Sequence, residues 1–570
     1  MSEKIKQTSR KYALQNAVQF NGKANPKAVI GKVIAVLRAE GFEPKEIIPI
    51  VNQVISDVNK LGIDKQTKEL EELAPELLVK EKKERDFSLP DLPEAEKGKV
   101  VTRFPPEPNG FLHIGHAKAS IVDYEYAKMY DGKFILRFDD TNPENADIKF
   151  YDAQKKDLEW LGISWDEEYC TSSNIKKHYE LAEQLIKQGD AYICQCGPDY
   201  IKECRFDGKE CNHRDCHSGE NLDLWKDLVN GGLDRGILRL KGDMSCDNTA
   251  MRDPTLFRII KKTHPLQGDK YRVWPTYDFA GAVEDSISGV THPFRTKEYE
   301  LRDECYYRLI DLLRIRRPYL MEFARLNIEG MPVSKRKIKP LIDNGVVSGF
   351  DDIRLPTLRG LRKRGILPEA IKQFVLSQGI SKVESTATFS LVESANRKIL
   401  DPIAKRFFFV PNPVKLVVKN APKMKKEIAF HPQNKEMGAR RIETDDVFYI
   451  PLSDADNLKK DEVFRLKDLY NVKIIDKKDE IIGEFAGEGL IAKSAKIQFT
   501  TDSFVEMTVN IPHNLFKDNL YNPGSLEKVR GYAESAVSNI EKEEIVQFER
   551  FGFVRLEKKD DQITGYMAHK

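Results

Sequence analysis

The chain has 570 residues, of which 40% are hydrophobic and 32% are charged, and its 92 Lys and Arg nearly cancel its 90 Asp and Glu to leave a net charge of +2. This length and composition indicate a folded protein of roughly three to four domains and exclude a global positive field, so a nucleic-acid partner would be bound by local basic patches. Because no apolar run approaches the ~20 residues of a membrane span, and none follows the first charged residues, we expect a cytoplasmic protein without membrane contact.

The first ninety or so residues have a helical pattern. Apolar residues fall at helical spacing in two runs, which are Ile30, Val33, Ile34 and Leu37 and, after Pro44, Ile47, Val51, Val54, Ile55 and Val58. The charged residues 80–86 and the Pro-containing residues 88–93 have the composition of a linker. We therefore expect a helical N-terminal extension with its linker over residues 1–95.

The next part of the chain alternates strand and helix patterns. Residues 99–104 and 133–138 read as strands, and residues 113–130 and 150–161 read as helices. This βαβα order predicts a parallel sheet with helices on its faces, and it returns around residues 270–329. From about residue 389, short apolar runs separated by Pro, Asn, Asp and Gly predict β-barrels or sandwiches.

The segment RFPPEPNGFLHIGH, residues 103–116, lies between the first predicted strand and its helix. His113 and His116 share a helix face, and at the first turn they would lie beside free backbone N–H groups and the positive end of the helix dipole, where phosphate binds. Gly115 would leave room for a planar base against the backbone. The absence of a Walker A loop excludes a P-loop ATPase. The alternative interpretation is two ordinary histidines on a surface helix.

Five of the eight cysteines lie within residues 194–216. Thiolates and imidazoles suit tetrahedral zinc, and four residues have the spacing of zinc ligands: Cys194, Cys196, Cys211 and His213. Cys204, Cys216 and His217 could substitute for one of them, so the choice of ligands stays open. The alternative is a set of buried free thiols, which such close spacing disfavours.

Residues 103–116 resemble the HIGH signature of class I aminoacyl-tRNA synthetases, in the form shared by the glutaminyl and the archaeal/eukaryotic-type glutamyl branches. The resemblance continues in order over nearly the whole chain, through residues 136–143, 274–279, 289–292, 324–327, 331–336, 355–365, 431–434 and 547–550. It implies an α/β fold with a Rossmann-like catalytic domain. The domains expected from it are a catalytic first half at 96–190, a zinc-bearing acceptor-binding insertion at 191–270, a catalytic second half at 271–345, a helical connector at 346–390 and anticodon-binding β-barrels at 391–570.

The resemblance also implies an ATP site with His113, His116 and Lys335 as catalytic residues. Residues 333–336 match the second signature of the class, KMSKS, although Pro332 and Val333 replace its first Lys and its Met, and the glutaminyl/glutamyl branch generally lacks that Lys. Lys335 on a mobile loop could neutralise the triphosphate as pyrophosphate leaves; the alternative is a basic surface turn. The remaining expected ATP contacts are Pro106, Glu107, Pro108, Asn109, Gly110, Phe111, Leu112, Ile114, Gly115, Arg325, Leu326, Val333 and Ser334.

For the amino acid, the resemblance implies that Asp139 holds the α-amino group, Arg103 contacts the carboxylate end and Tyr277 lines the side-chain pocket. The glutamyl branch has Arg at the position of Arg295, where the glutaminyl branch has a small uncharged residue. A guanidinium group in a closed pocket matches a substrate with an additional carboxylate. The alternatives are a helix cap or turn for Asp139 and a solvated side chain for Arg295.

The implied reaction is ATP-dependent ligation of L-glutamate to tRNA through a glutamyl-adenylate, with release of AMP and pyrophosphate. Mg²⁺ would accompany the ATP, and Zn²⁺ would be structural. A glutaminyl-tRNA synthetase and a non-catalytic tRNA-binding paralogue are the alternatives. The expected partners are tRNA, at its acceptor stem and anticodon, and a tRNA-dependent amidotransferase acting downstream. Within such a family, candidate phosphate contacts are residues 359–364 and 423–426 and, more weakly, Arg440 and Arg441. The alternative for the basic runs is a solvated surface.

Overall fold

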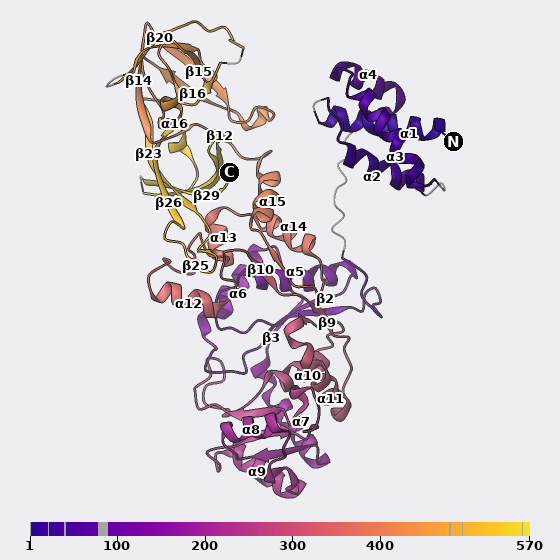
Figure 1. Cartoon of the computed structure of the whole chain (residues 1–570). Helices are drawn as coiled ribbons and strands as arrows, with labels where there is room; N and C mark the ends of the chain where they lie inside the picture. Colours follow the sequence, from indigo (N-terminus) through magenta and orange to yellow (C-terminus); the bar gives the residue numbers. More distant parts are fainter. Residues whose placement is uncertain are drawn as a thin grey trace. The chain divides into compact units, whose positions relative to one another are not determined.

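The computed structural model describes residues 2–20, 22–38, 42–77, 89–477, 480–492, 494–560 and 562–570. The chain divides into two compact units, Met1–Asp86 and Phe87–Lys570 (Figure 1). Of the linker predicted at residues 80–93, residues 80–88 lie outside the described part of the chain.

The first unit is a bundle of helices, as its apolar spacing predicts. It contains α1 (Ser2–Gln19), α2 (Pro26–Arg38), α3 (Pro44–Val58), α4 (Ile63–Leu73) and the short 3-10 helix η1 (Pro75–Leu77). Helix α3 begins at Pro44, whose fixed φ suits the first turn of a helix. All four longer helices contribute buried apolar side chains to one core. The prediction of a helical N-terminal extension is confirmed.

A parallel sheet forms the centre of the second unit. Its order is β1 (Val101–Phe104), β2 (Lys133–Phe138) and β3 (Glu167–Cys170), and the crossovers are α5 (Ile114–Met129) and α6 (Ile148–Trp160). Two parallel pairs follow, β8 (Phe294–Thr296) with β9 (Met321–Phe323) and β10 (Leu326–Ile328) with β11 (Ser385–Ala387). The carboxyl ends of β1 and β2 open toward the same edge, where ligands bind in such sheets. The predicted α/β class is confirmed.

An antiparallel sheet interrupts this pattern. Its order is β4 (Ala191–Cys194), β5 (Ile237–Leu240), β6 (Thr255–Ile259) and β7 (Val273–Pro275). The helices of this region are α7 (Ile175–Gln188), α8 (Pro198–Asp207) and α9 (Ser218–Asn230), with η2 (Thr171–Asn174), η3 (Asn212–Asp215) and η4 (Thr249–Met251). One apolar core joins the sheet to α7, α10 (Tyr277–Ile287) and α11 (Asp303–Leu313). The predicted boundaries at residues 190 and 270 thus fall within a shared core, and they stay predictions.

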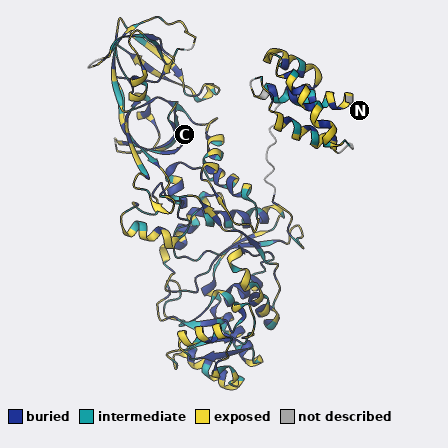
Figure 2. Cartoon of the chain, viewed as in Figure 1, coloured by how far each residue is buried: buried dark blue, intermediate teal, exposed yellow. Residues whose placement is uncertain are grey.

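Helices connect the parallel strands to the C-terminal sheets. They are η5 (Lys297–Arg302), which precedes α11, then α12 (Lys335–Asp343), α13 (Leu358–Arg364), α14 (Pro368–Gln378) and α15 (Ser390–Leu400). Two seven-stranded sheets follow, and buried residues lie along their strands (Figure 2). The first contains β12 (Arg406–Phe407), β27 (Glu543–Phe548), β28 (Gly552–Lys559), β29 (Gln562–His569), β23 (Phe504–Pro512), β26 (Leu526–Glu534) and β13 (Phe409–Pro411). The second contains β21 (Lys496–Ile497), β18 (Val463–Leu466), β19 (Asn471–Lys477), β20 (Ile481–Phe485), β14 (Pro413–Lys419), β17 (Val447–Pro451) and β22 (Thr500–Thr501). This barrel-like C-terminal region has the β texture predicted from the sequence.

Small elements complete the two C-terminal sheets. They are the hairpin β15 (Met424–Ala429) and β16 (Ala439–Thr444), the pair β24 (Phe516–Lys517) and β25 (Leu520–Tyr521), and the helices α16 (Leu452–Asn457), η6 (Lys435–Met437) and η7 (Ser535–Asn539). None of the helices in the described part of the chain combines the length and apolarity that a membrane crossing demands.

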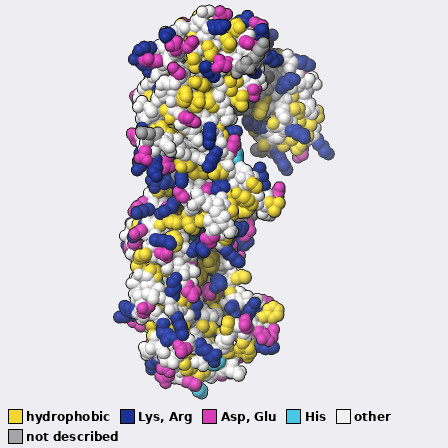
Figure 3. Space-filling model, turned by 90° about the vertical axis from the view of Figure 1, so that its left-hand side faces the viewer, with side chains coloured by type: hydrophobic (Ala, Val, Ile, Leu, Met, Phe, Trp, Pro, Cys, Tyr) yellow, Lys and Arg dark blue, Asp and Glu magenta, His cyan; other side chains and the backbone are white. Residues whose placement is uncertain are grey.

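Two of the candidate phosphate contacts are buried instead. Arg364 donates to the carbonyl of Ala568 at 3.1 Å and pairs with Glu393. Arg440 pairs with Glu534 at 2.5 Å and is 3% exposed. A buried guanidinium group that already has a carboxylate partner cannot reach a phosphate without stranding that partner, so the predictions for Arg364 and Arg440 were wrong. On the face in Figure 3, basic and acidic side chains are interspersed, in keeping with the net charge of +2.

Candidate active site

The turn after β1 is held by hydrogen bonds from two donors to three of its backbone carbonyl groups. The Gln154 amide on α6 donates to the carbonyls of Glu107 at 3.0 Å and Gly110 at 2.8 Å. The N–H of Asp139 donates to the carbonyl of Pro106 at 3.0 Å. Carbonyl groups of an irregular turn have no ladder or helix partner, so these donors fix its path. The turn therefore delivers His113 to the start of α5 in a defined position.

His113 and His116 cap α5 reciprocally. Nδ1 of His113 accepts from the N–H of Gly115 at 3.1 Å, Nδ1 of His116 accepts from the N–H of His113 at 3.2 Å, and the two rings stack with centroids 3.9 Å apart. Burial lowers the pKa of His113 well below its ordinary value, and it lowers the pKa of His116 to about 4, with Arg325 adding to both shifts. Both rings are therefore neutral near pH 7. Because each Nδ1 accepts, the proton lies on Nε2 in each ring.

The first turn of α5 does not offer the free N–H groups that the sequence predicts. The N–H of Ile114 donates to the carbonyl of Pro356 at 2.9 Å, that of Gly115 donates to His113, and that of His116 donates to the carbonyl of His113 at 2.8 Å. The expectation of open backbone donors was wrong, because the two histidines and the segment before α13 satisfy them. What remains for an anion is the helix dipole and the two Nε2–H groups.

Gly115 also has a close contact with His113 that the sequence did not predict. A Cβ at this position would lie 2.9 Å from Cε1 of His113 and 3.4 Å from Cγ1 of Val333. The His113 ring and Val333 of the second signature therefore lie close over its backbone, and its contact with a planar base stays a prediction. Glycine is required here because the imidazole ring approaches the backbone closely.

The second signature lies against the turn of the first. Lys335 begins α12, and its ammonium group donates to the carbonyl of Asn109. Its side chain would touch a Cβ at Gly110, and burial lowers its pKa. Arg325 pairs with Glu298 at 2.7 Å, and its charge reaches both histidines. The structure thus brings Lys335 and Val333 together with residues 109–116, whereas Leu326 is buried in β10.

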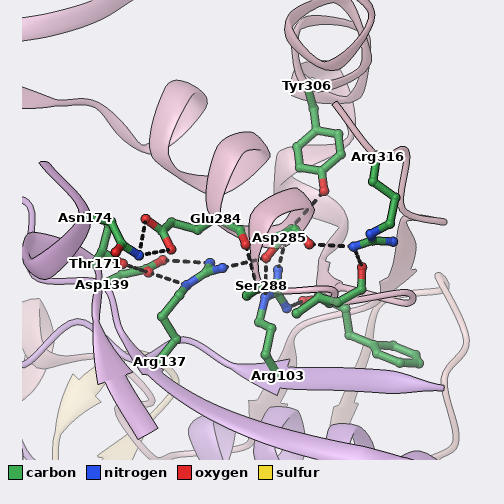
Figure 4. Close-up of polar contacts among 12 residues, drawn as sticks. Arg103, Arg137, Asp139, Thr171, Asn174, Glu284, Asp285, Ser288, Tyr306 and Arg316 are labelled. Carbon is green, nitrogen blue, oxygen red and sulfur yellow. Dashed lines mark hydrogen bonds and ion pairs between the residues drawn. The ribbon is translucent and has the colours of Figure 1, made fainter. Parts of the chain in front are cut away.

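A buried carboxylate organises the amino-acid end of the site (Figure 4). Asp285 on α10 accepts from Arg103 at 3.0 and 3.2 Å, from Arg137 at 2.7 Å and from the Tyr306 hydroxyl at 3.2 Å. Burial alone would raise the pKa of Asp285, but the two guanidinium groups lower it below its ordinary value. Arg103 also donates from Nη1 to the carbonyl of Phe294 at 2.7 Å. Three of the five N–H donors of Arg103 are therefore in use and two remain.

Arg137 links this carboxylate to Asp139. Its Nε donates to Oδ1 of Asp139 at 2.8 Å, and the Thr171 hydroxyl donates to the same oxygen at 2.9 Å. The Asp139 side chain is 19% exposed, so it keeps accessible acceptor positions. Its neighbour Asp140 is buried and accepts from the N–H and the hydroxyl of Ser172, both at 2.8 Å. Asp140 thus fixes the turn, and Asp139 remains available for a ligand.

A small cavity adjoins this network. It is lined by Arg103, Tyr277, Asp278, Gly281, Asp285, Arg295, Arg302, Tyr306 and Leu320. Three of the four residues expected to bind the amino acid thus line one cavity, and Asp139 connects to it through Arg137. The side chain of Arg295 lies in β8 and is only 5% exposed, so the alternative of a solvated Arg295 was wrong.

The cysteine-rich segment gathers four potential ligands. The ligand atoms of Cys194, Cys196, Cys211 and His213 lie within 4.8 Å of one another. The sulfur atoms of Cys194 and Cys211 are 3.8 Å apart, and the sulfur of Cys196 is 3.4 Å from Nδ1 of His213. Strand β4 supplies the first cysteine and the start of η3 supplies the third, so residues distant in sequence converge. Cys204, Cys216 and His217 lie outside this group.

Sequence reasoning missed the carboxylate at the centre of the site and the arginine that joins it to Asp139. Asp285 follows Glu284 in an otherwise apolar stretch of α10, and both acids are buried. Arg137 is the one buried charge of strand β2, whose other charged residue, Lys133, is exposed at its start. Charges in buried elements require partners. The charged residues Arg137 and Asp285 were therefore the sequence signal that could have revealed this network. Their pairing across 148 residues could not be read from local pattern.

Comparisons with known proteins agree along the whole chain. The model of the catalytic domain of "tRNA synthetases class I (E and Q)" matches residues 99–402, and two models of the anticodon-binding domain of that family match residues 404–488 and 491–557. A glutamate–tRNA ligase of Nitrosopumilus maritimus is 45% identical and one of Pyrococcus furiosus is 42% identical; each match covers 99–100% of this chain and 100% of the relative. Among solved structures, a glutamate tRNA ligase from Elizabethkingia meningosepticum has a TM-score of 0.42 at 19% identity, over 54% of this chain and 70% of that chain.

Proposed function

Because the chain belongs to the class I tRNA synthetases (E and Q), whose models match residues 99–402, 404–488 and 491–557, we propose that it joins L-glutamate to tRNA with the consumption of ATP. Relatives that are 45% and 42% identical over their full length are glutamate–tRNA ligases. The same residues that resemble the family in sequence converge around two adjoining places, the histidine-capped start of α5 and the cavity beside Arg103.

The charge of the side chains that line the cavity is the observation that favours glutamate as the substrate. Three arginines, Arg103, Arg295 and Arg302, line the cavity with two aspartates, Asp278 and Asp285, so its wall has one net positive charge. A substrate with a side-chain carboxylate can accept from a guanidinium edge with both oxygens, whereas a glutamine amide would turn an N–H₂ donor toward that edge. No feature of the described residues favours glutamine.

The reaction needs positioning and charge stabilisation and no side-chain nucleophile. A carboxylate oxygen of glutamate attacks the α-phosphorus of ATP, and pyrophosphate leaves; a hydroxyl of the terminal ribose of tRNA then attacks the carbonyl carbon, and AMP leaves. Lys335 and the Nε2–H groups of His113 and His116 stabilise the charge on the phosphates. Asp139 takes the α-ammonium group, and the two remaining N–H donors of Arg103 face the carboxylate end. Mg²⁺ enters with the ATP.

The Cys194 cluster fits a structural zinc ion. Around tetrahedral zinc with Zn–S bonds of about 2.3 Å, two sulfur ligands lie about 3.8 Å apart, and a sulfur and a nitrogen ligand about 3.5 Å apart. The separations of 3.8 and 3.4 Å match these values. With four protein ligands the ion would link β4 to η3. It would have no open coordination position and would take no part in the chemistry. Purified protein should contain about one zinc ion per chain by elemental analysis; its absence would remove this proposal.

Aminoacylation with purified components tests the function. The wild-type chain is expected to charge tRNA specific for glutamate with glutamate and not with glutamine, and Arg295→Cys is expected to lose most of that preference. ATP–pyrophosphate exchange in the presence of tRNA separates an active enzyme from a tRNA-binding paralogue. Charging of glutamine by the wild-type chain would overturn the proposal. Parallel assays with tRNA specific for glutamine show whether an amidotransferase must act downstream.

A further inference from the structure

Arg295 has its carboxylate partners outside the cavity that it lines. It contributes to the cavity wall together with Tyr277 and Tyr306, whereas the two carboxylates nearest to its guanidinium group, Asp303 and Glu322, are not part of that wall. The guanidinium group therefore lies between the cavity and two negative charges. These two carboxylates therefore orient the guanidinium group before any substrate enters the cavity.

Two carboxylates and one aromatic ring surround this guanidinium group. Nη2 of Arg295 forms an ion pair with Asp303, the first residue of α11, and Nε lies 3.7 Å from Oε1 of Glu322, its register partner across β8 and β9. The ring of Tyr306 lies 5.4 Å from the centre of the group. Nη1 makes no hydrogen bond with any of the described residues, and it is not among the buried atoms without a partner. Since Nη1 carries two N–H groups, one edge of the fork is left for a ligand.

The two carboxylates behind Arg295 differ in what else they bind. Glu322 is 2% exposed and shares its charge with Lys382 at 2.7 Å, which also contacts Glu300 at 3.2 Å. Asp303 is 31% exposed, and Arg295 is its ion-pair partner. Without Asp303, one edge of a buried guanidinium group would lose its partner, and Glu322 would remain as the single carboxylate that attracts it. The guanidinium group would then turn away from its present orientation.

We propose that Asp303 is a positioning residue for the recognition of glutamate. It holds the Nη2 edge of Arg295 so that the Nη1 edge faces the cavity, where it binds the side-chain carboxylate of the substrate. The inference rests on the proposed glutamate–tRNA ligase activity and assigns within it a residue that touches no substrate atom. Asp303 acts on the choice between glutamate and glutamine through Arg295, and it has no part in ATP binding.

The test uses the full chain carrying Asp303→Asn, which keeps the shape of the side chain and removes its charge. The KM for glutamate is expected to rise ~10-fold with kcat within ~2-fold of the wild type and the KM for ATP unchanged, because ground-state recognition is affected and the ATP site is not. The ratio of kcat/KM for glutamate to that for glutamine should fall in parallel. Asp303→Glu should recover part of the loss. Glu304→Gln is the matched control, since it removes the neighbouring charge at the same helix start.

Each other outcome overturns the proposal. An unchanged KM for glutamate in folded Asp303→Asn would show that Arg295 needs no anchor, and a lower KM would show that Asp303 competes with the substrate. An equal rise in Glu304→Gln would trace the effect to the charge at the start of α11. Should asparagine prevent folding, Asp303→Ser repeats the measurement with another residue suited to a helix start. Failure of the wild-type chain to charge glutamate would instead refute the proposed function, independently of Asp303.

Discussion

Gly115 is the residue at which the HIGH segment is most sensitive to a single added carbon. It is the second residue of α5, where alanine would ordinarily favour the helix. A Cβ there would meet Cε1 and Nδ1 of His113 at 2.9 and 3.0 Å. The added methyl group must displace the ring that accepts from the N–H of Gly115, so the orientation of Nε2 of His113 changes with it.

We expect Gly115→Ala to lower the activity of the protein and to change its stability little. ATP–pyrophosphate exchange should fall at least ~10-fold through the displaced imidazole, while the free energy of unfolding changes by less than about 1 kcal/mol because alanine suits the helix. Gly219→Ala is the control, because Gly219 is also the second residue of a helix and a Cβ there meets nothing within 4 Å. Equal exchange activity in the two variants would contradict this role of Gly115.

The role of a single residue could be predicted where it depends on nearby residues in the sequence, and not where it depends on a distant segment. Arg295 and Tyr277 could be placed in the pocket by resemblance, and they do line one cavity. The open N–H groups at His113 could not be judged, because the partner of Ile114 is the carbonyl of Pro356, more than two hundred residues away. Arg440 was misjudged for the same reason, since its carboxylate Glu534 is on a distant strand.

At the scale of elements, the pair Arg440–Glu534 joins the hairpin strand β16 to β26. Nε of Arg440 lies 2.5 Å from Glu534, and Nη1 donates to the carbonyl of Ala429 at 2.7 Å. Burial raises the pKa of Glu534 to about 7, although the guanidinium group opposes the shift. The folded protein therefore holds a proton that the unfolded chain releases near its ordinary pKa of about 4.3.

This raised pKa predicts a pH-dependent contact between β16 and β26. Between about pH 4.3 and 7 the folded state binds more protons than the unfolded state, so stability falls as pH rises and levels off above 7. Hydrogen exchange of β26 amides should give a local free energy about 2–3 kcal/mol lower at pH 7.5 than at pH 5. Glu534→Gln should abolish this difference, whereas Glu527→Gln, at an exposed position of the same strand, should retain it. A flat profile in the wild type would contradict the prediction.

Helices and parallel strands were more predictable than the C-terminal strands. The strand at residues 133–138 was predicted to the residue, and α6 begins two residues before the expected start. Their signals are periodicity and turn residues within one short window. The strands after residue 389 have clear composition, but their order depends on pairing such as β12 with β27, whose partners are 141 residues apart in the chain. Register of that kind is set by packing between distant segments.

At the scale of the whole molecule, the cores show which parts of the chain depend on each other. The catalytic sheet shares one core with α13, α14 and α15 and with Phe553 and Ala568 of the C-terminal sheet. Composition and turn residues divide the chain into segments, but they do not show that side chains from different segments pack into one hydrophobic core. The helices of residues 2–77 have fifteen buried apolar residues that form a core of their own. The second unit should therefore not depend on them for its folding.

A fragment of residues 1–77 is accordingly expected to fold alone. It should give a helical circular dichroism spectrum and a cooperative thermal transition. On α2, Val33 is fully buried and Val36 is 38% exposed, so Val33→Ala should lower the free energy of unfolding by about 1–3 kcal/mol and Val36→Ala by no more than about 0.5 kcal/mol. In the full chain, Val33→Ala should leave the transition of residues 87–570 unmoved, because among the described residues their cores contain none from the first unit. A shift of that transition would show that the two units stabilise each other.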